Sequence, residues 1–174
     1  MSNPALLQAL VDNPKAMKLF ISSLLLLVFA CNSEQKLSSS ATDDFSKTVI
    51  IYAETPCFGE CPIFSMTLDG AKMLATFKGE ANTPKIGVFT KPISNTEFAR
   101  FIDALDKARF NKLDEEYMGR VPDFPIREIT VMRNGKTKKV RNRSEAPPEL
   151  GELEQVFKTF ANTDGWNKSE TKDH

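Results

Sequence analysis

Two cysteines separated by three residues set the tightest constraint on how this chain folds. The stretch Thr55-Pro-Cys-Phe-Gly-Glu-Cys-Pro62 places a proline beside each of Cys57 and Cys61, with a glycine between them. The interior of a helix or a strand does not accommodate this density of proline and glycine. The stretch therefore predicts a tight cross-linked loop, with β-branched and aromatic residues on both sides that favour strands.

The N-terminal residues have the pattern of an export signal that ends in a lipid-attachment site. From Met17 the chain reads Met-Lys, then a dozen apolar and small residues, and then Cys31, and this run is too short to cross a bilayer as a helix. Val28-Phe-Ala-Cys31 resembles the lipobox of bacterial lipoproteins, in which the cysteine is diacylated and becomes the new N-terminus. Residues 1–30 are thus expected to be a signal peptide, with translation starting at Met17 or with an extended n-region. A plain signal peptide or an uncleaved anchor is the alternative.

Residues 31–46 are polar and rich in serine, and they predict a flexible tether between the lipid and the folded domain. Asn32 is not the aspartate that is associated with inner-membrane retention, so an outer-membrane lipoprotein is expected, facing either side of that membrane. Export also places Cys57 and Cys61 in an oxidising compartment, which favours a structural disulfide. The third cysteine, Cys31, then has the separate task of carrying the lipid.

Residues 47–167 predict a single α+β domain, followed by a disordered tail at 168–174. A capping box at Ser94 and Glu97 begins one helix, and Pro147 and Pro148 begin the other. Asn134-Gly135 is a favoured two-residue hairpin turn, and counting from it places Glu128 opposite Arg141. The expected strands are 47–53, 63–68, 72–78, 85–90, 126–133 and 136–142, with a two-residue turn at Asp69-Gly70. The order β-β-β-β-α-β-β-α predicts an antiparallel sheet with both helices packed on one face.

With these residues in view, the chain resembles the uncharacterised bacterial family known as domain of unknown function 6438 (DUF6438). The resemblance rests on the motif at residues 55–62 with an aromatic near Phe64, on the turn at 69–70, on Asp123-Phe-Pro125 and on Asn134-Gly135-x-Lys. It spans about residues 49–166. This chain departs from the family in having Pro122 where threonine is common, and phenylalanine where the aromatic after the second cysteine is usually tyrosine. The resemblance implies the domain boundaries and a lipoprotein, and it implies no activity, because the family has none assigned.

Several classes of chemistry lack the residues they need. Lys and Arg total 23, as do Asp and Glu, so no net charge favours nucleic acid, and no nucleic-acid partner is expected outside the cytoplasm. The sole histidine is His174, which disfavours Ser-His-Asp and Cys-His catalysis and a Cys/His metal site, and no cofactor is expected. Thiol redox chemistry usually uses Cys-x-x-Cys at a helix N-terminus, whereas here the spacing is longer and Pro62 leads into a strand. A hydrolase built on carboxylates such as Asp114, Glu115, Glu116 and Asp123 stays open by counting alone.

The sequence therefore favours a non-enzymatic interaction domain, with an envelope enzyme, redox or hydrolytic, as the alternative. The candidate contact surfaces are the sheet face opposite the helices and the rim around Phe58. Lys139 and Arg141 belong to a basic hairpin that could bind an anionic envelope component or an acidic partner, or could simply keep an edge strand from aggregating. Asp123, between prolines, is expected to cap a turn. The expected partners are the membrane, through lipid on Cys31, and an unidentified envelope protein or anionic component.

Overall fold

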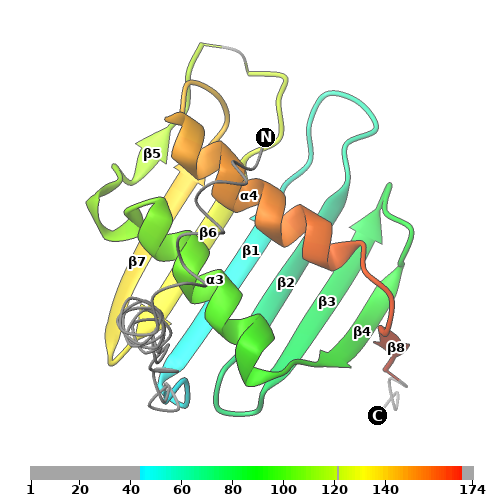
Figure 1. Cartoon of the computed structure of the whole chain (residues 1–174). Helices are drawn as coiled ribbons and strands as arrows, with labels where there is room; N and C mark the ends of the chain where they lie inside the picture. The colour runs from blue at the N-terminus through cyan, green and yellow to red at the C-terminus, as the bar shows by residue number, and fades with distance from the viewer. Residues whose placement is uncertain (1–43, 121, 170–174) are drawn as a thin grey trace, which may run out of the picture. The chain divides into compact units, whose positions relative to one another are not determined.

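The computed structural model describes residues 44–120 and 122–169, so the expected signal peptide, Cys31 and nearly all of the expected tether lie outside the described residues. Eight strands form one sheet in the order β5-β7-β6-β1-β2-β3-β4-β8 (Figure 1). The strands are β1 (Thr48–Glu54), β2 (Ile63–Asp69), β3 (Leu74–Ala81), β4 (Gly87–Pro92), β5 (Glu116–Tyr117), β6 (Arg127–Arg133), β7 (Lys136–Asn142) and β8 (Asn167–Lys168). The helices are α3 (Asn95–Lys107), the 3-10 helix η1 (Phe110–Lys112) and α4 (Pro148–Ala161).

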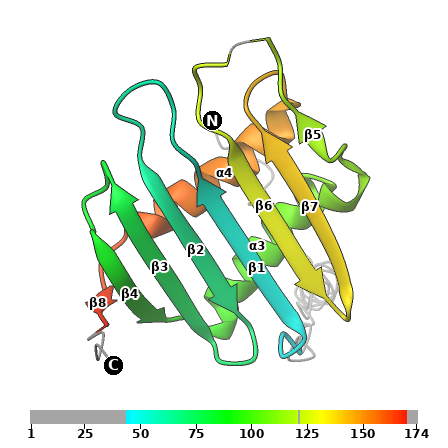
Figure 2. The same ribbon diagram turned by 180° about the vertical axis from the view of Figure 1, so that it is seen from behind.

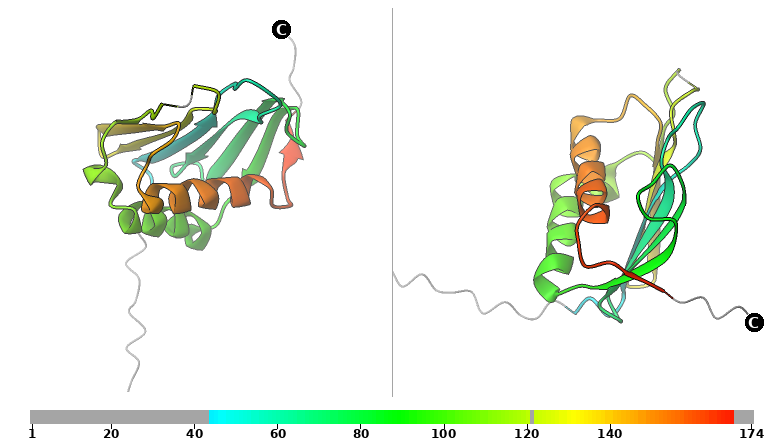
Figure 3. Two further views of the ribbon diagram at one scale, coloured as in Figure 1. Left: turned by 90° about the horizontal axis from the view of Figure 1, so that it is seen from above. Right: turned by 90° about the vertical axis from the view of Figure 1, so that its right-hand side faces the viewer.

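Both described α-helices cover the same face of the sheet, and none of the described helices covers the opposite face, which we call the open face (Figures 2 and 3). The alternation of side chains along each strand produces this arrangement, since Ile50 and Tyr52 of β1 are fully buried under the helices while Ile51 is half-buried on the open face. The α+β class is therefore confirmed. Two strands of two residues, β5 and β8, were not expected, and because β5 runs parallel to β7 the sheet is mixed.

The two helices pack against the sheet through apolar side chains. Ser94 and Glu97 form the expected capping box, and Phe98 and Phe101 of α3 lie in the core. On α4, the ring of Phe157 stacks on Tyr52 of β1 at 5.1 Å and lies 5.3 Å from Phe101. Phe157 thus joins the sheet to both helices.

One hairpin follows its expected register and another does not. In the β6–β7 hairpin, Arg133 pairs with Lys136 and Glu128 with Arg141, as expected from the Asn134-Gly135 turn. In the β2–β3 hairpin, the expected two-residue turn is wrong, because Asp69 pairs with Leu74 and four residues form the connection. Gly70 serves another purpose: a Cβ there would overlap the backbone carbonyl of Phe45, so glycine permits a close approach of two segments.

Within the described residues, the packed part of the chain begins at Phe45, which lies in the stretch expected to be tether. Phe45 is buried, its ring stacks on Phe98 at 4.7 Å, and its carbonyl accepts a hydrogen bond from the amide of Thr48 at 2.8 Å. Among the described helices, none is both long enough and apolar enough to cross a membrane.

Candidate functional site

Three loops lie at one end of the strands, and we call this end of the sheet the loop rim. They are the described residues of 55–62 between β1 and β2, 82–86 between β3 and β4, and 118–126 before β6. Strand pairing brings these loops together (Figure 1). Glu54, the last residue of β1, pairs with Phe64 of β2 and with Arg127 of β6. Gly79 of β3 pairs with Phe64 and with Gly87 of β4. The opposite end of the sheet contains the start of β1, where the amide of Asn134 donates to the carbonyl of Lys47 at 3.1 Å.

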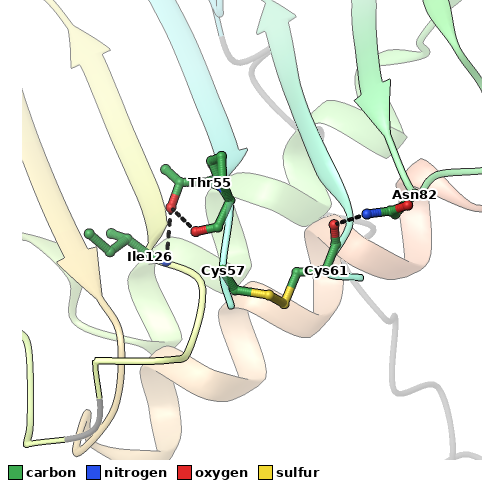
Figure 4. Close-up of a disulfide and its surroundings, with 6 residues drawn as sticks. Thr55, Cys57, Cys61, Asn82 and Ile126 are labelled. Carbon is green, nitrogen blue, oxygen red and sulfur yellow. Dashed lines mark hydrogen bonds between the residues drawn. A yellow bond between two sulfur atoms is a disulfide. The ribbon is translucent and has the colours of Figure 1, made fainter. Parts of the chain in front are cut away.

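The middle loop of the rim is closed by a disulfide between Cys57 and Cys61, as expected, with their Cα atoms 5.9 Å apart (Figure 4). The flanking residue Thr55 ties this loop to the loop before β6: its amide donates to the carbonyl of Ile126 at 3.0 Å, and its hydroxyl accepts from the amide of Ile126 at 3.0 Å. On the other side, the side-chain amide of Asn82 donates to the carbonyl of Cys61 at 3.1 Å. The cross-linked loop is thus fixed to both of its neighbours.

Each rim loop exposes one large apolar side chain. Phe58 is 88% exposed, Ile86 is 54% exposed and Phe124 is 53% exposed. Within the described residues these three are the exposed large hydrophobic side chains, and all of them lie on the rim. The amide of Phe58 also donates to the backbone carbonyl of Asp123 at 3.3 Å, so two of the predicted binding residues meet here, although the side chain of Asp123 is exposed.

A cavity of about 280 Å³ lies behind the rim. Its walls are mostly apolar and include Phe64, Phe77 and prolines from all three rim loops, and its polar lining includes Glu54 and Lys158. The side chain of Glu54 is 4% exposed; its Oε1 accepts a hydrogen bond from the hydroxyl of Tyr52 at 2.5 Å and lies 3.0 Å from Nζ of Lys158. The carboxylate of Glu54 is therefore already paired.

A second buried carboxylate, Glu154 of α4, lies in the same layer between helix and sheet. Its Oε1 accepts from the side-chain amide of Asn142 at 2.6 Å, and its Oε2 lies 3.2 Å from Nε of Arg127. Burial raises the pKa of Glu154, and burial together with the neighbouring Glu54 raises the pKa of Tyr52. Because each carboxylate has its own cationic partner, the pair fastens α4 to β1, β6 and β7.

Neither of these glutamates was predicted from the sequence as a site residue, although the position of each carried a signal. Glu54 continues the inward positions of β1 after Ile50 and Tyr52, and Glu154 follows Leu150 by four residues on the apolar stripe of α4. A charged residue at an inward position indicates a buried ion pair. The carboxylates that the sequence did single out, at 114–116 and 123, are exposed.

The other two predicted binding residues, Lys139 and Arg141, lie on the open face of β7 and not at the rim. Nζ of Lys139 lies 2.8 Å from Oε1 of Glu128, and Nη1 of Arg141 lies 2.7 Å from Oε1 of Glu116. Arg141 and Glu128 also form the expected cross-strand pair, at 3.7 Å. Acidic neighbours thus offset much of the positive charge of these two side chains.

The part of the chain that the structure describes contains no group of three or more His, Cys, Asp or Glu placed to hold a metal ion. In comparisons with known proteins, a family model described as "Domain of unknown function (DUF6438)" matches residues 48–161, which is more than half of the 174-residue chain. A search of curated proteins found no match.

Proposed function

Since the chain belongs to the family described as a domain of unknown function (DUF6438), a description that assigns no activity, we propose its role from its own residues. It is the interaction domain of a membrane-tethered lipoprotein of the bacterial envelope, and it binds an envelope partner through the loop rim. The observation that carries this proposal is the gathering of Phe58, Ile86 and Phe124 on three joined loops.

The apolar rim has the composition of a contact surface. Aromatic residues are enriched in the central part of protein interfaces, and apolar side chains that gather on one exposed surface have a cost in water that a partner removes. The disulfide and the hydrogen bonds to Ile126 and Asn82 fix the backbone that carries Phe58. A partner therefore meets a surface whose ordering cost is low, which favours affinity.

The position of the rim suits a tethered domain. The chain enters the domain at the end of the sheet where β1 begins, and the rim lies at the other end of β1. The seven residues of β1 correspond to a distance of roughly 20 Å. If lipid on Cys31 anchors the chain to the outer membrane, a domain that stands away from the lipid presents the rim to the compartment that the protein faces. The lipobox-like Val28-Phe-Ala-Cys31 and the polar residues after it support this anchoring.

The pairing of the buried carboxylates favours an interaction domain over a hydrolase. General acid and base catalysis needs carboxyl groups that are free to exchange protons with a substrate. Glu54 is instead bound by Lys158 and Tyr52, and Glu154 by Arg127 and Asn142. These contacts support a role in fixing α4 to the sheet.

Site-specific photo-crosslinking in cells tests the contact surface. A photoreactive residue in place of Phe58 or Phe124 is expected to capture the same partner from both positions. The control is the same residue in place of Lys78, which is exposed on β3. Capture at Lys78 with none at the two rim positions would show that the open face of the sheet, and not the rim, is the contact surface.

A separate experiment tests the anchoring. Cys31→Ser removes the sulfur that would carry the lipid, so the protein should move from the membrane fraction to the soluble fraction of the cell and should no longer incorporate labelled fatty acid. If Cys31→Ser stays in the membrane fraction to the same extent as the unchanged chain, the lipid anchor on Cys31 is refuted while the rim proposal still stands.

A further inference from the structure

The outer edge of β7 is half covered. The short strand β5 pairs with Arg141 and Asn142 only, and the amide of Arg141 donates to the carbonyl of Glu115 at 2.8 Å. Because backbone groups alternate in direction along a strand, this bond shows that the amide and carbonyl of Thr137 and Lys139 also point away from β6. In the described part of the chain, no backbone partner is recorded for the outward groups of these two residues. The first half of β7 is thus a strand edge that no described strand pairs with.

A groove of about 420 Å³ lies beside this free edge, between the β6–β7 hairpin and the C-terminal end of α3 with η1. We call it the edge groove. Its floor is apolar and includes Leu105, Phe110 and Val131. Its lining also includes Lys136 and Lys138, which are inward positions of β7 by the same alternation that buries Val140.

The edge groove carries an excess of positive charge. Its lining contains three cationic side chains, Arg133, Lys136 and Lys138, and one carboxylate, Asp106. Nζ of Lys138 lies 3.9 Å from Oε1 of Glu115, which is a long distance for an ion pair. Arg133 and Lys136 form no ion pair with any described residue. An occupant with negative charge therefore complements the groove.

We propose that the edge groove binds an acidic, extended peptide segment of a partner protein, which adds a strand beside the first half of β7. This surface is distinct from the loop rim, and the proposal does not depend on the rim's role. Strand addition obtains affinity from backbone hydrogen bonds, here to Thr137 and Lys139, and obtains selectivity from the side chains that alternate into a neighbouring pocket. The apolar floor accepts one side chain of the added strand, and acidic side chains two positions before and after it meet the cations of the lining.

A second copy of the chain fits this edge less well than an acidic peptide. Two β7 edges that paired about a two-fold axis would bring the lysines at 136, 138 and 139 of one copy against those of the other. Like charges directly opposite one another destabilise paired strands. The same lysines that oppose self-association attract an acidic strand.

The test uses the full chain, kept in solution by a non-ionic detergent, and a fluorescent synthetic peptide, Thr-Glu-Thr-Val-Thr-Glu-Thr. Fluorescence anisotropy measures its binding, and hydrogen exchange measured by NMR identifies the edge. We expect saturable binding, with the amides of Thr137 and Lys139 gaining protection. A peptide with lysine in place of both glutamates should bind at least about tenfold more weakly, because charge repulsion replaces charge attraction.

Two variants locate the contact on the protein. Thr137→Pro removes an outward N–H that makes no ladder bond, so the fold should persist while peptide binding falls at least about tenfold. Thr137→Val keeps the N–H and is the matched control, and it should bind as the unchanged chain does. The double variant Lys136→Glu and Lys138→Glu should reverse the preference in favour of the lysine peptide.

Several outcomes would overturn the proposal. One is the absence of acidic-peptide binding up to millimolar concentration, which would mean that the lysines only keep the edge from pairing. Another is binding that Thr137→Pro leaves unchanged while circular dichroism shows an intact fold. A third is a dimer of the unliganded chain, detected by sedimentation, that Thr137→Pro dissociates, because the edge would then be filled by a second copy.

Discussion

Replacing Phe157 by alanine should remove the contact that joins the sheet to both helices. Phe157 is fully buried, with Tyr52 at 5.1 Å and Phe101 at 5.3 Å from ring centre to ring centre. A phenylalanine buries about 200 Å², which at about 25 cal/mol per Å² corresponds to about 5 kcal/mol, of which alanine retains a small part. We therefore expect Phe157→Ala to lower the free energy of unfolding by about 4 kcal/mol, within the range of roughly 3–5 kcal/mol typical of such core substitutions.

Phe58→Ala is the matched control, because it deletes the same atoms at an exposed position. Phe58 is 88% exposed, so about an eighth of the burial term applies and the expected loss is about 0.5 kcal/mol. Guanidinium chloride unfolding, followed by far-ultraviolet circular dichroism, measures both variants against the unchanged chain. The m-value should stay constant if both variants unfold in the same two-state manner.

The central packing role of Phe157 is refuted if Phe157→Ala and Phe58→Ala destabilise the chain equally, or if Phe157→Ala lowers the free energy of unfolding by less than about 1 kcal/mol. The first result would mean that the rim is packed against other residues. The second would mean that α4 is not held to the sheet through Phe157. In either case the assignment of Phe58 to a contact surface would lose its basis, because that assignment rests on the same division between core and surface.

Three further predictions concern the disulfide, a buried carboxyl group and two glycines. Replacing Cys57 and Cys61 together by alanine should lower the free energy of unfolding by about 2 kcal/mol, since closing so short a loop removes little chain entropy. Equilibrium unfolding measures this change, and a loss of more than about 4 kcal/mol would contradict the prediction. The pKa of Glu154 is raised in the fold, so its neutral form favours folding at pH values below its ordinary pKa of 4.5. As the pH rises from there through the raised pKa, the unchanged chain should lose stability relative to Glu154→Gln. A gain in stability relative to Glu154→Gln would show that the ion pair outweighs burial. Gly70→Ala should destabilise the fold, because the added Cβ would overlap the backbone of Phe45. Gly151→Ala should stabilise the fold by up to about 1 kcal/mol, because the added Cβ meets nothing within 4 Å and the residue lies in a helix. Thermal unfolding that shows a change in the same direction for both variants would contradict this packing.

Features that depend on neighbouring residues in the sequence could be predicted, and the β6–β7 hairpin is the clearest case. Asn134 and Gly135 have positive φ angles, 52° and 74°, which the two-residue turn requires, and the turn then fixes every pair in the two strands. The turn after Asp69 failed for the opposite reason. Glycine is needed at position 70 because the backbone of Phe45, more than twenty residues earlier, approaches it closely. The polar residues on both sides of Phe45 gave no indication that Phe45 lies in the core.

The candidate site was predictable only in part, because its members meet through strand order. The cysteine motif identified Phe58 as part of an exposed bend, and it does lie on the rim. Ile86 and Phe124 gave no comparable signal, since an apolar residue in a loop is ordinary until it is known which loops are neighbours. They join Phe58 because β6 pairs with one side of β1 while β2 and β3 lie on its other side, and this order is a property of the whole sheet.

The disulfide is better explained by the rim than by the stability of the fold. A bond that closes so short a loop contributes roughly 2 kcal/mol, whereas a single core side chain such as Phe157 contributes about twice as much. The loop is moreover already held by hydrogen bonds to Ile126 and Asn82. What the bond adds is a limit on the backbone on either side of Phe58, which is 88% exposed and has little packing of its own. Reduction should therefore loosen the position of Phe58 and weaken contacts at the rim while the sheet and helices stay folded, so that binding and stability respond to the same chemical change by different amounts.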